Sequence, residues 1–350
     1  MKYPALLPFS QVLPEIGQYD TIIDVRTPAE YAEDHIPGAI NCPVLDNDER
    51  VRIGTLYKQT GPFEAKKAGA ALVAKNIAYH LEHTFADMPR EWRPLVYCWR
   101  GGNRSGSMAH ILAKIGWPAV QVEGGYKAYR QEVNLGMPEL VAPFEFRVVC
   151  GTTGSGKSRL LEAMHGEGMQ VLDLEQLAAH RGSVLGPLPG TPQPTQKAFE
   201  SRIWNALRGF DPARPVYIES ESKKVGSVRV PDALIAKMRA SRCIALDTPR
   251  ELRLQLLMED YAHFVRDAAS LNEQLSYLTS LYGHDKIQAW QALANSGDMR
   301  TLVDQLLAEH YDPAYLRSIA RNFARYGEAQ VLTLGGIDHA ALVRAAQRLA

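Results

Sequence analysis

Long apolar runs are missing from this 350-residue sequence, which excludes an ordinary membrane-spanning helix. No segment approaches the roughly 20 apolar residues that such a helix needs. The N-terminal stretch MKYPALLPFS is interrupted by prolines and has no continuous apolar region, so it is a poor signal peptide. We therefore expect a cytoplasmic chain with no membrane partner.

Net charge is missing as well, because 39 Lys and Arg residues balance 39 Asp and Glu residues. No overall field draws the chain to nucleic acid, and any surface for nucleic acid must be a local patch. Cysteine is scarce, and the cysteines lack the paired spacing of zinc sites or disulfide scaffolds. They are Cys42, Cys98, Cys150 and Cys243. A reduced compartment is expected.

The length favours two domains, and alternating strands and helices predict an α/β fold. The first domain should contain residues 1–138, and Pro138 and Pro143 should frame a short connector. Apolar strands of this domain are expected at 21–25, 94–97 and 119–122.

The second domain, residues 139–350, is expected to hold a parallel sheet and to end in a helical region. Its strands are expected at 144–150, 170–173, 214–221 and 242–248. The sequence has no internal repeat or low-complexity tract, and it indicates no oligomeric state.

A lone cysteine followed by glycines and arginines, in the stretch Tyr97–Ser105, is the first candidate site. An apolar strand precedes it and a helix is expected from Ser105 to Ile115, so the thiol would lie in a strand-to-helix loop. Guanidinium charge, loop N–H groups and a helix N-terminus all favour the nucleophilic thiolate. The catalytic candidates are Cys98, Arg100 and Arg104, and the anion-holding loop comprises Gly101, Gly102, Asn103 and Ser105.

Gly101 and Gly102 are expected to permit positive φ, which would turn consecutive backbone N–H groups toward an anion. A buried core cysteine is the alternative interpretation of Cys98, since most single thiols are core residues. Core cysteines are not normally flanked by Arg-Gly-Gly and Arg-Ser, which favours the reactive thiol.

The octet GTTGSGKS fits the P-loop pattern at every fixed position, and it lies between an expected strand and an expected helix. Its backbone N–H groups would surround a diphosphate, Lys157 would reach the outer oxygens, and Ser158 could hold Mg²⁺. The expected phosphate-binding residues are Gly151, Thr152, Thr153, Gly154, Ser155, Gly156, Lys157 and Ser158.

Other charged residues are weaker candidates. Glu219 and Glu221 fall at a strand end, where a carboxylate can orient Mg²⁺ or its bound water. Three arginines recur at four-residue spacing and could contact the phosphates of a nucleic acid, although a solvated helix face is at least as good an interpretation. They are Arg317, Arg321 and Arg325. Asp24 and Arg26 are expected to form a structural ion pair. The aromatic residues that could stack on a base, or lie in the core, are Trp99, Tyr126 and Tyr129.

The first domain resembles rhodanese-like sulfurtransferases over nearly its whole length. The resemblance rests on DVRTPAEY from Asp24, HIPGAIN from His35, the Cys98 loop and EGGY from Glu123. Arg104 lies six residues after Cys98, one more than is typical of that family, which should widen the anion pocket. This spacing is also that of phosphatases, but no placed acid for a leaving alcohol stands out.

A rhodanese-like domain with CWRGG, fused to a P-loop domain with GTTGSGKS, resembles the tRNA 2-selenouridine synthase family. YKQ from Tyr57, HRGS from His180 and ESESKK from Glu219 are also similar to that family. The resemblance implies a partner tRNA with 2-thiouridine at the wobble position, and two co-substrates, geranyl diphosphate and selenophosphate. The sulfur would first be geranylated, and selenium carried as a perselenide on Cys98 would then replace it.

The resemblance implies no tightly bound cofactor, although Mg²⁺ could accompany the diphosphate, and a selenophosphate-producing enzyme could be a partner. Our hypothesis is that geranyl diphosphate, rather than ATP or GTP, occupies the P-loop, because no base-specificity motif follows the fourth strand of the second domain. Two alternatives stay open at this point. One is an ATP-activated tRNA sulfurtransferase, and the other is a P-loop NTPase whose rhodanese-like part only recognises a partner.

Overall fold

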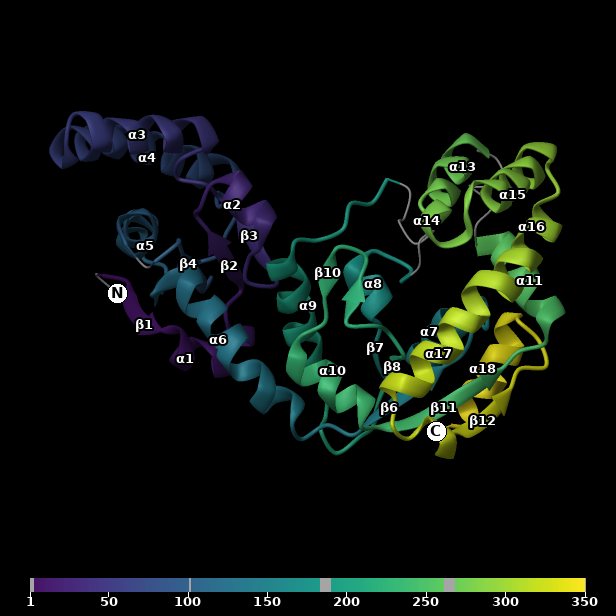
Figure 1. Cartoon of the computed structure of the whole chain (residues 1–350). Coiled ribbons are helices and arrows are strands. Elements are labelled where there is room, and N and C mark those ends of the chain that lie inside the picture. The colour runs from purple at the N-terminus through teal and green to yellow at the C-terminus, as the bar shows by residue number, and fades with distance from the viewer. Residues whose placement is uncertain (1–2, 101, 183–189, 261–267, 350) are drawn as a thin grey trace. The chain divides into compact units, whose positions relative to one another are not determined.

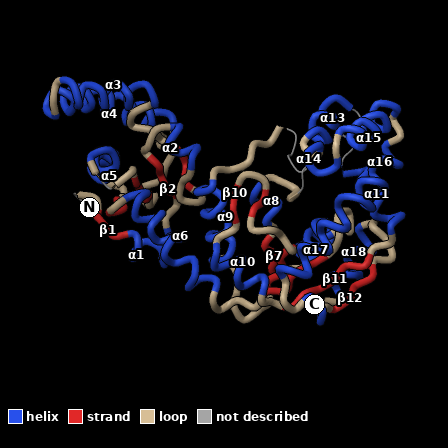
Figure 2. The backbone as a smooth tube through the Cα atoms, viewed as in Figure 1, coloured by secondary structure: helices blue, strands red, loops and turns tan. Residues whose placement is uncertain are grey.

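The structure is a computed structural model that describes residues 3–100, 102–182, 190–260 and 268–349 (Figure 1). The chain forms two compact units, each drawn from two separate stretches of sequence. The first unit takes residues 1–137 and 194–205, and the second takes residues 138–193 and 206–350. Each unit contains a five-stranded parallel sheet with helices beside it (Figure 2), which confirms the expected α/β fold.

The first unit has the strand order β1-β5-β4-β2-β3. Its strands are β1 (Ala5–Pro8), β2 (Thr21–Asp24), β3 (Ala39–Asn41), β4 (Pro94–Tyr97) and β5 (Val120–Glu123). Its helices are α1 (Phe9–Val12), α2 (Pro28–Glu33), α3 (Asn47–Gln59), α4 (Pro62–His83), α5 (Asn103–Ile115) and α6 (Gly125–Val141). The central strand β4 is buried at every position, as expected of a parallel strand with helices on both faces.

Helix α5 is amphipathic, and its apolar face forms part of the core of the first unit. Met108, Ala109 and Leu112 recur at helical spacing, and all three are fully buried in the cluster that also contains Cys98. Burial of this face fixes the helix against the sheet, so the N-terminus of α5 is held next to the loop after β4.

The connector expected between Pro138 and Pro143 is wrong in its first part, because Pro138 lies inside α6. Proline removes the N–H that would donate to the carbonyl of Asn134, a loss that α6 tolerates. The carbonyl of Pro138 still accepts from the N–H of Ala142 at 3.1 Å, so the helix continues beyond the proline.

Residues 194–205 return to the first unit, which the sequence analysis did not anticipate. They include most of α9 (Gln196–Arg208). The hydroxyl of Ser201 donates to the buried carboxylate of Asp34 at 3.0 Å. The ring of Trp204 packs edge-on against Tyr129, with 5.8 Å between ring centroids. The first fold is therefore complete only when this later segment is in place.

The second unit has the strand order β12-β11-β6-β8-β7. Its parallel strands are β6 (Phe146–Cys150), β7 (Gln170–Leu172), β8 (Val216–Glu219), β11 (Arg242–Asp247) and β12 (Gln330–Thr333), and β9 (Lys224–Val225) pairs with β10 (Val228–Arg229) in a short antiparallel ribbon. The edge strand β12 was missed by the sequence analysis, which expected only helix in this part of the chain.

Helices supply the rest of the second unit. They are α7 (Lys157–Gly166), α8 (Leu174–Ala178), α10 (Asp232–Arg239), α11 (Arg250–Asp260), α13 (Ala268–Ser276), α14 (Thr279–Tyr282), α15 (His284–Ser296), α16 (Met299–Leu306), α17 (Asp312–Asn322) and α18 (His339–Gln347). The expected helical region is present, and α13, α15 and α16 enclose an apolar cluster of their own around the fully buried Trp290.

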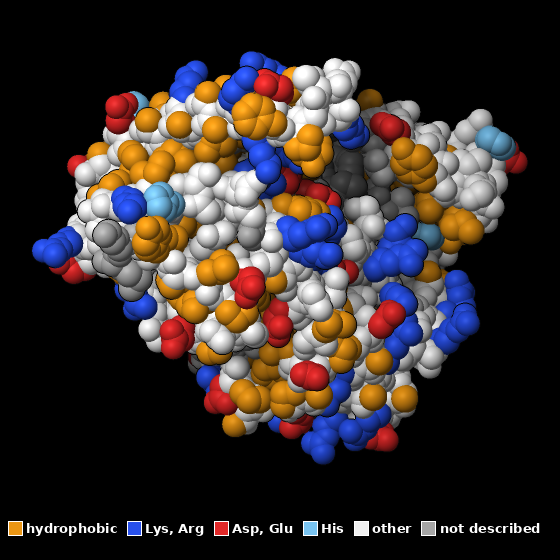
Figure 3. All heavy atoms as spheres, turned by 90° about the vertical axis from the view of Figure 1, so that its left-hand side faces the viewer, with side chains coloured by type: hydrophobic (Ala, Val, Ile, Leu, Met, Phe, Trp, Pro, Cys, Tyr) orange, Lys and Arg blue, Asp and Glu red, His pale blue; other side chains and the backbone are white. Residues whose placement is uncertain are grey.

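None of the helices within the described residues combines the length and apolar character that crossing a bilayer requires. Charged side chains of both signs are spread among apolar ones on the face shown in Figure 3. This distribution agrees with the balanced charge of the sequence.

Candidate functional sites

Cys98 follows β4 directly and lies just before α5, as the sequence predicts. Its sulfur accepts hydrogen bonds from the N–H of Gly102 at 3.4 Å and from the hydroxyl of Ser105 at 3.3 Å. Gln121 on β5 donates to the Ser105 oxygen at 3.1 Å, and the Ser105 hydroxyl also lies 3.3 Å from the carbonyl of Gly102. Gly102 makes its contact at φ −109°, so the expected positive φ is wrong for this glycine. Gly101 lies outside the described residues.

The surroundings of Cys98 favour the thiolate, although the side chain is buried. Burial raises the pKa of the thiol, but hydrogen bonds from the Ser105 hydroxyl and from the N–H groups of Ser105, Gly102 and Arg100 outweigh it and lower the pKa below its ordinary value. The N-terminus of α5 adds a favourable dipole. The pKa of the core cysteine Cys42 is shifted in the opposite direction, because burial and the charge of Asp24 raise it to about 12.

The two arginines expected to clamp an anion differ in their contacts. Arg104 forms a two-point ion pair with Glu30, at 2.7 and 3.1 Å, and Glu30 also closes the capping box of α2. Arg100 is exposed on the loop. Asn103 begins α5, and its carbonyl accepts from Ser107 at 2.8 Å. The roles of these residues at an anion stay predictions.

The expected ion pair between Asp24 and Arg26 is confirmed. Both side chains are buried, and the guanidinium contacts the carboxylate at 2.6 Å. Tyr126 and Tyr129 are core residues, which leaves Trp99, 38% exposed, as the candidate for stacking on a base next to Cys98.

The GTTGSGKS octet forms a strand–loop–helix at the carboxyl end of β6 and the start of α7, as the sequence predicts. Gly154 and Gly156 take φ values of +75° and +88°, which only glycine adopts readily. A Cβ on Gly154 would lie 2.7 Å from a Leu257 side-chain carbon, so the loop is close-packed here. The Lys157 ammonium donates to the carbonyl of Gly151 at 2.6 Å.

Residues from distant segments hold the outer part of this loop. The Tyr315 hydroxyl lies 2.7 Å from the N–H of Gly151 and accepts from it, and it also bonds to Ser220 at 2.9 Å. Arg253 donates to the carbonyl of Thr153 and pairs with Asp312. Tyr315 was not predicted from the sequence, because nothing in a single helical tyrosine points to a loop far away in the chain.

Four carboxyl groups lie at the ends of β7 and β8, on the same edge of the sheet as the P-loop. They are Asp173, Glu175, Glu219 and Glu221. Burial and the neighbouring Glu221 raise the pKa of Glu175 to about 8, and Glu175 accepts from the Ser158 hydroxyl at 3.1 Å. Burial and the neighbouring carboxylates also raise the pKa of Glu219, whose second oxygen is buried with no partner. Glu175 was also missed, although its position after the second strand of a parallel sheet was an available signal.

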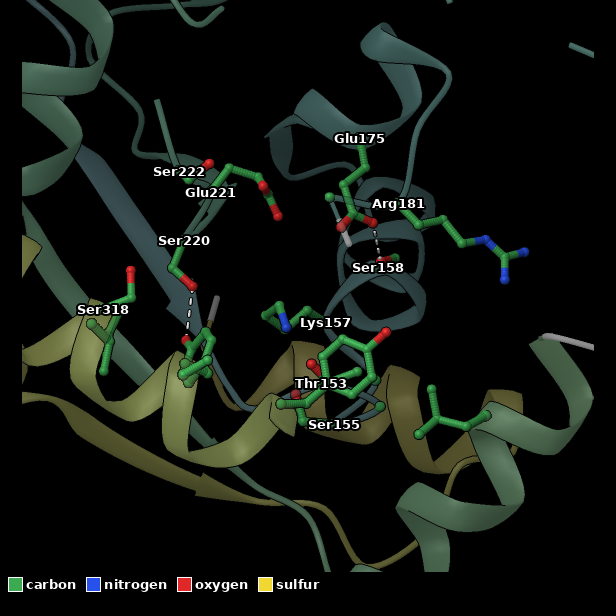
Figure 4. A pocket seen from close by; sticks show the side chains of 18 of the residues that line it. Thr153, Ser155, Lys157, Ser158, Glu175, Arg181, Ser220, Glu221, Ser222 and Ser318 are labelled. Atoms are coloured by element: carbon green, nitrogen blue, oxygen red, sulfur yellow. Dashed lines mark hydrogen bonds between the residues drawn. The ribbon is translucent and has the colours of Figure 1, made fainter. Parts of the chain in front are cut away.

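A cavity of about 370 Å³ opens over the P-loop. Figure 4 shows Lys157 in the middle of it, with Glu175 and Glu221 facing the loop from the opposite side. Within the described ranges, no group of three or more His, Cys, Asp or Glu side chains could hold a metal ion by itself. Mg²⁺ usually takes one or two protein ligands together with phosphate oxygens, and Ser158 with Glu175 fits that smaller requirement.

The expected arginine stripe is wrong for its last member. Arg317 and Arg321 lie exposed on α17, but the helix ends at Asn322 and the chain turns. Arg325 is non-helical, and its guanidinium pairs with Glu328. The four-residue spacing therefore does not continue along one helix face.

Comparisons with known proteins identify both domains of the chain. The family model of the tRNA 2-selenouridine synthase AAA domain matches residues 144–330, and that of the rhodanese-like domain matches residues 10–132. A tRNA 2-selenouridine synthase of Nitrosomonas europaea is 31% identical, covering 86% of this chain and 89% of its own. One from Alcanivorax borkumensis is 33% identical over 86% and 90%, and one from Marinobacter nauticus is 30% identical over 90% and 91%. With a P-loop unit and a rhodanese-like unit in one chain and relatives of this extent, the protein belongs to the tRNA 2-selenouridine synthase family.

Proposed function

We propose that this protein is an enzyme that converts 2-thiouridine at the wobble position of tRNA into 2-selenouridine in two steps. The first step is S-geranylation from geranyl diphosphate at the P-loop. The second is replacement of the geranylated sulfur by selenium from selenophosphate, carried on Cys98. The observation that carries the proposal is that one chain holds a thiol of lowered pKa in a strand-to-helix loop and, separately, a P-loop with its lysine, Lys157.

The first step needs a site that accepts the charge of a leaving diphosphate. The sulfur of 2-thiouridine attacks C1 of the geranyl group, the C–O bond to the diphosphate breaks, and the base loses its N3 proton. Lys157 and the loop N–H groups are suited to stabilise the departing charge. Ser158 and Glu175 would hold Mg²⁺, which would neutralise part of that charge when bound.

Geranylation makes the second step chemically easier, because an alkylated sulfur leaves as a thiol whereas the doubly bonded sulfur is a poor leaving group. Hydrolysis of selenophosphate at phosphorus gives phosphate and selenide. Joining selenide to the Cys98 sulfur releases two electrons. A low-molecular-weight disulfide would accept them and become two thiols. The terminal selenium then attacks C2 of the base and geranyl thiol leaves. Two thiols reduce the S–Se bond, become a disulfide, and so free both Cys98 and the selenouridine.

The contacts of Cys98 support its role as carrier. Its pKa is lowered by neutral donors from Ser105 and the loop, and Arg104 pairs with Glu30. The site can therefore hold a charged sulfur or selenium atom and still leave Arg100 exposed for the phosphate that is released.

The test is mass analysis of nucleosides from 2-thiouridine tRNA after addition of geranyl diphosphate and Mg²⁺, and then of selenophosphate with a thiol and its disulfide. We expect Lys157→Ala to abolish geranylation while Cys98 still acquires selenium in the intact-protein mass. Cys98→Ser should accumulate geranylated tRNA and form no selenouridine.

Two results would contradict this proposal. Loss of both steps in each variant would refute the division between two sites. Competition of ATP at micromolar concentration against labelled geranyl diphosphate would place a nucleotide at the P-loop and favour an ATP-activated sulfurtransferase.

A further inference from the structure

One basic side chain in the P-loop cavity, Arg239, has no partner among the residues that the structure describes. Arg239 is the last residue of α10, and it lines the same cavity as Lys157 and Ser158. Its Nε is buried from solvent and makes no hydrogen bond. Within the described residues, its guanidinium also has no ion pair. A buried polar group that lacks a partner is destabilising, so this Nε position is unfavourable unless an acceptor reaches it.

The other basic side chains that line this cavity are all engaged. Lys157 donates to the Gly151 carbonyl, and Arg159 pairs with Glu259 and Asp260. Arg181 donates to the carbonyl of Asp260 at 2.7 Å. Among the described residues that line this cavity, Arg239 is therefore the basic side chain left without a hydrogen bond or an ion pair.

The surroundings of Arg239 hold it in place without neutralising it. Its carbonyl accepts from the N–H of Ala324 at 3.2 Å, which fixes the end of α10 beside the end of α17. This part of the cavity is lined by Ser318, Asn322 and Phe323, none of which carries a negative charge. In Figure 4, Ser220 and Ser318 lie on the opposite side of Lys157 from Arg181, so the cavity extends well to both sides of the P-loop lysine.

We propose that Arg239 is a second phosphate-binding point of the P-loop cavity. A guanidinium presents N–H donors in a fixed fork that matches two phosphate oxygens, and Nε is one of the donors of that fork. Arrival of a phosphate would give the buried Nε its missing acceptor and neutralise the charge. A carboxylate could satisfy the same donors, but the acidic side chains that line this cavity have other neighbours. Glu175 bonds to Ser158, Glu221 lies near Lys157, and Asp260 pairs with Arg159.

Two sources could supply the phosphate, and this inference rests on the proposed function for both of them. One source is the diphosphate, through the one of its two phosphate groups that lies farther from Lys157. The other is the backbone phosphate of the RNA next to the base that is brought to the P-loop. Hydroxyl and amide side chains around Arg239 suit either a phosphate or a ribose.

The experiment measures binding of two probes to the full chain by calorimetry or fluorescence. The first probe is inorganic pyrophosphate with Mg²⁺ and no RNA, and the second is an anticodon stem–loop RNA that carries 2-thiouridine. The variants are Arg239→Met, which removes the charge and the donors, and Arg239→Lys, which keeps the charge but not the fork. Arg242→Met is the matched control, because Arg242 is exposed and does not line this cavity.

We expect Arg239→Met to weaken one probe at least about tenfold, Arg239→Lys to weaken it less, and Arg242→Met to leave it unchanged. Weaker pyrophosphate binding without RNA assigns the site to the diphosphate. Weaker RNA binding, with a salt slope smaller by about one, assigns it to an RNA phosphate. Unchanged affinity for both probes, or a wild-type chain that binds neither, overturns the proposal.

A thermal melt separates this role from a structural one. Arg239→Met should leave the melting temperature of the ligand-free protein unchanged or raise it, since it removes an unpartnered buried donor. A lowered melting temperature would identify Arg239 as a structural residue and overturn the proposal. If thiouridine tRNA is not alkylated by the wild type but Arg239→Met still loses pyrophosphate binding, the proposed function fails and the phosphate site stands.

Discussion

Replacing Ser105 with alanine would remove the hydroxyl that donates to the Cys98 sulfur at 3.3 Å. Ser105 is fully buried, so water cannot readily take the place of the lost donor. A hydrogen bond to a charged group contributes about 1.5 kcal/mol or more, and about 1.4 kcal/mol changes a proton equilibrium tenfold. The pKa of Cys98 should rise, and the thiolate fraction at a pH below it should fall about tenfold.

The assay is the rate of alkylation of Cys98 by iodoacetamide between pH 5 and pH 9. Mass analysis of the Cys98 peptide is needed because the other three cysteines are also buried thiols. Ser107→Ala is the matched control, since its hydroxyl donates to the Asn103 carbonyl at 2.8 Å and not to the sulfur. An unchanged pH profile in Ser105→Ala, or an equal change in Ser107→Ala, would refute the idea that this hydroxyl stabilises the thiolate.

Two further predictions concern buried charge. Burial and a neighbouring carboxylate raise the pKa of Glu175 from its ordinary 4.5 to about 8. Between these two pH values the folded chain keeps a proton on Glu175 that the unfolded chain has released. Stability should therefore fall as pH rises from about 4.5 to about 8, and Glu175→Gln should flatten that fall in thermal melts without Mg²⁺; a decline as steep as that of the wild type would contradict this. Asp24→Asn would leave the buried Arg26 without its counter-charge, at a cost of about 3–5 kcal/mol in urea unfolding. A cost below about 1 kcal/mol would show that the charge is solvated.

Local patterns predicted the parts of each site that are continuous in sequence. The strand before Cys98, the helix after it and the P-loop octet all depend on short-range rules of burial, periodicity and glycine conformation. Contacts between distant segments were not predictable in this way. Tyr315 on the Gly151 N–H, and Ser201 on Asp34, depend on how later helices pack, and no local pattern encodes that.

The predictions for the arginine stripe and for the region of β12 were wrong for a related reason. Four-residue spacing indicates a helix only while the helix lasts, and the chain leaves α17 before Arg325. The strand at Gln330–Thr333 is short and mostly exposed, so it lacks the apolar run that marked the other strands. These residues form a strand because they pair with β11, and this pairing exists only in the folded sheet.

The return of residues 194–205 to the first unit affects how the protein is made. A ribosome produces the whole rhodanese-like sequence, then the P-loop, and only afterwards the segment that carries Ser201 and Trp204. The N-terminal fold therefore cannot finish during synthesis before much of its neighbour has emerged. A gene cut at a single boundary near residue 138 would yield two fragments. The first would lack residues 194–205, and the second would carry α9 without the residues of the first unit on which it packs.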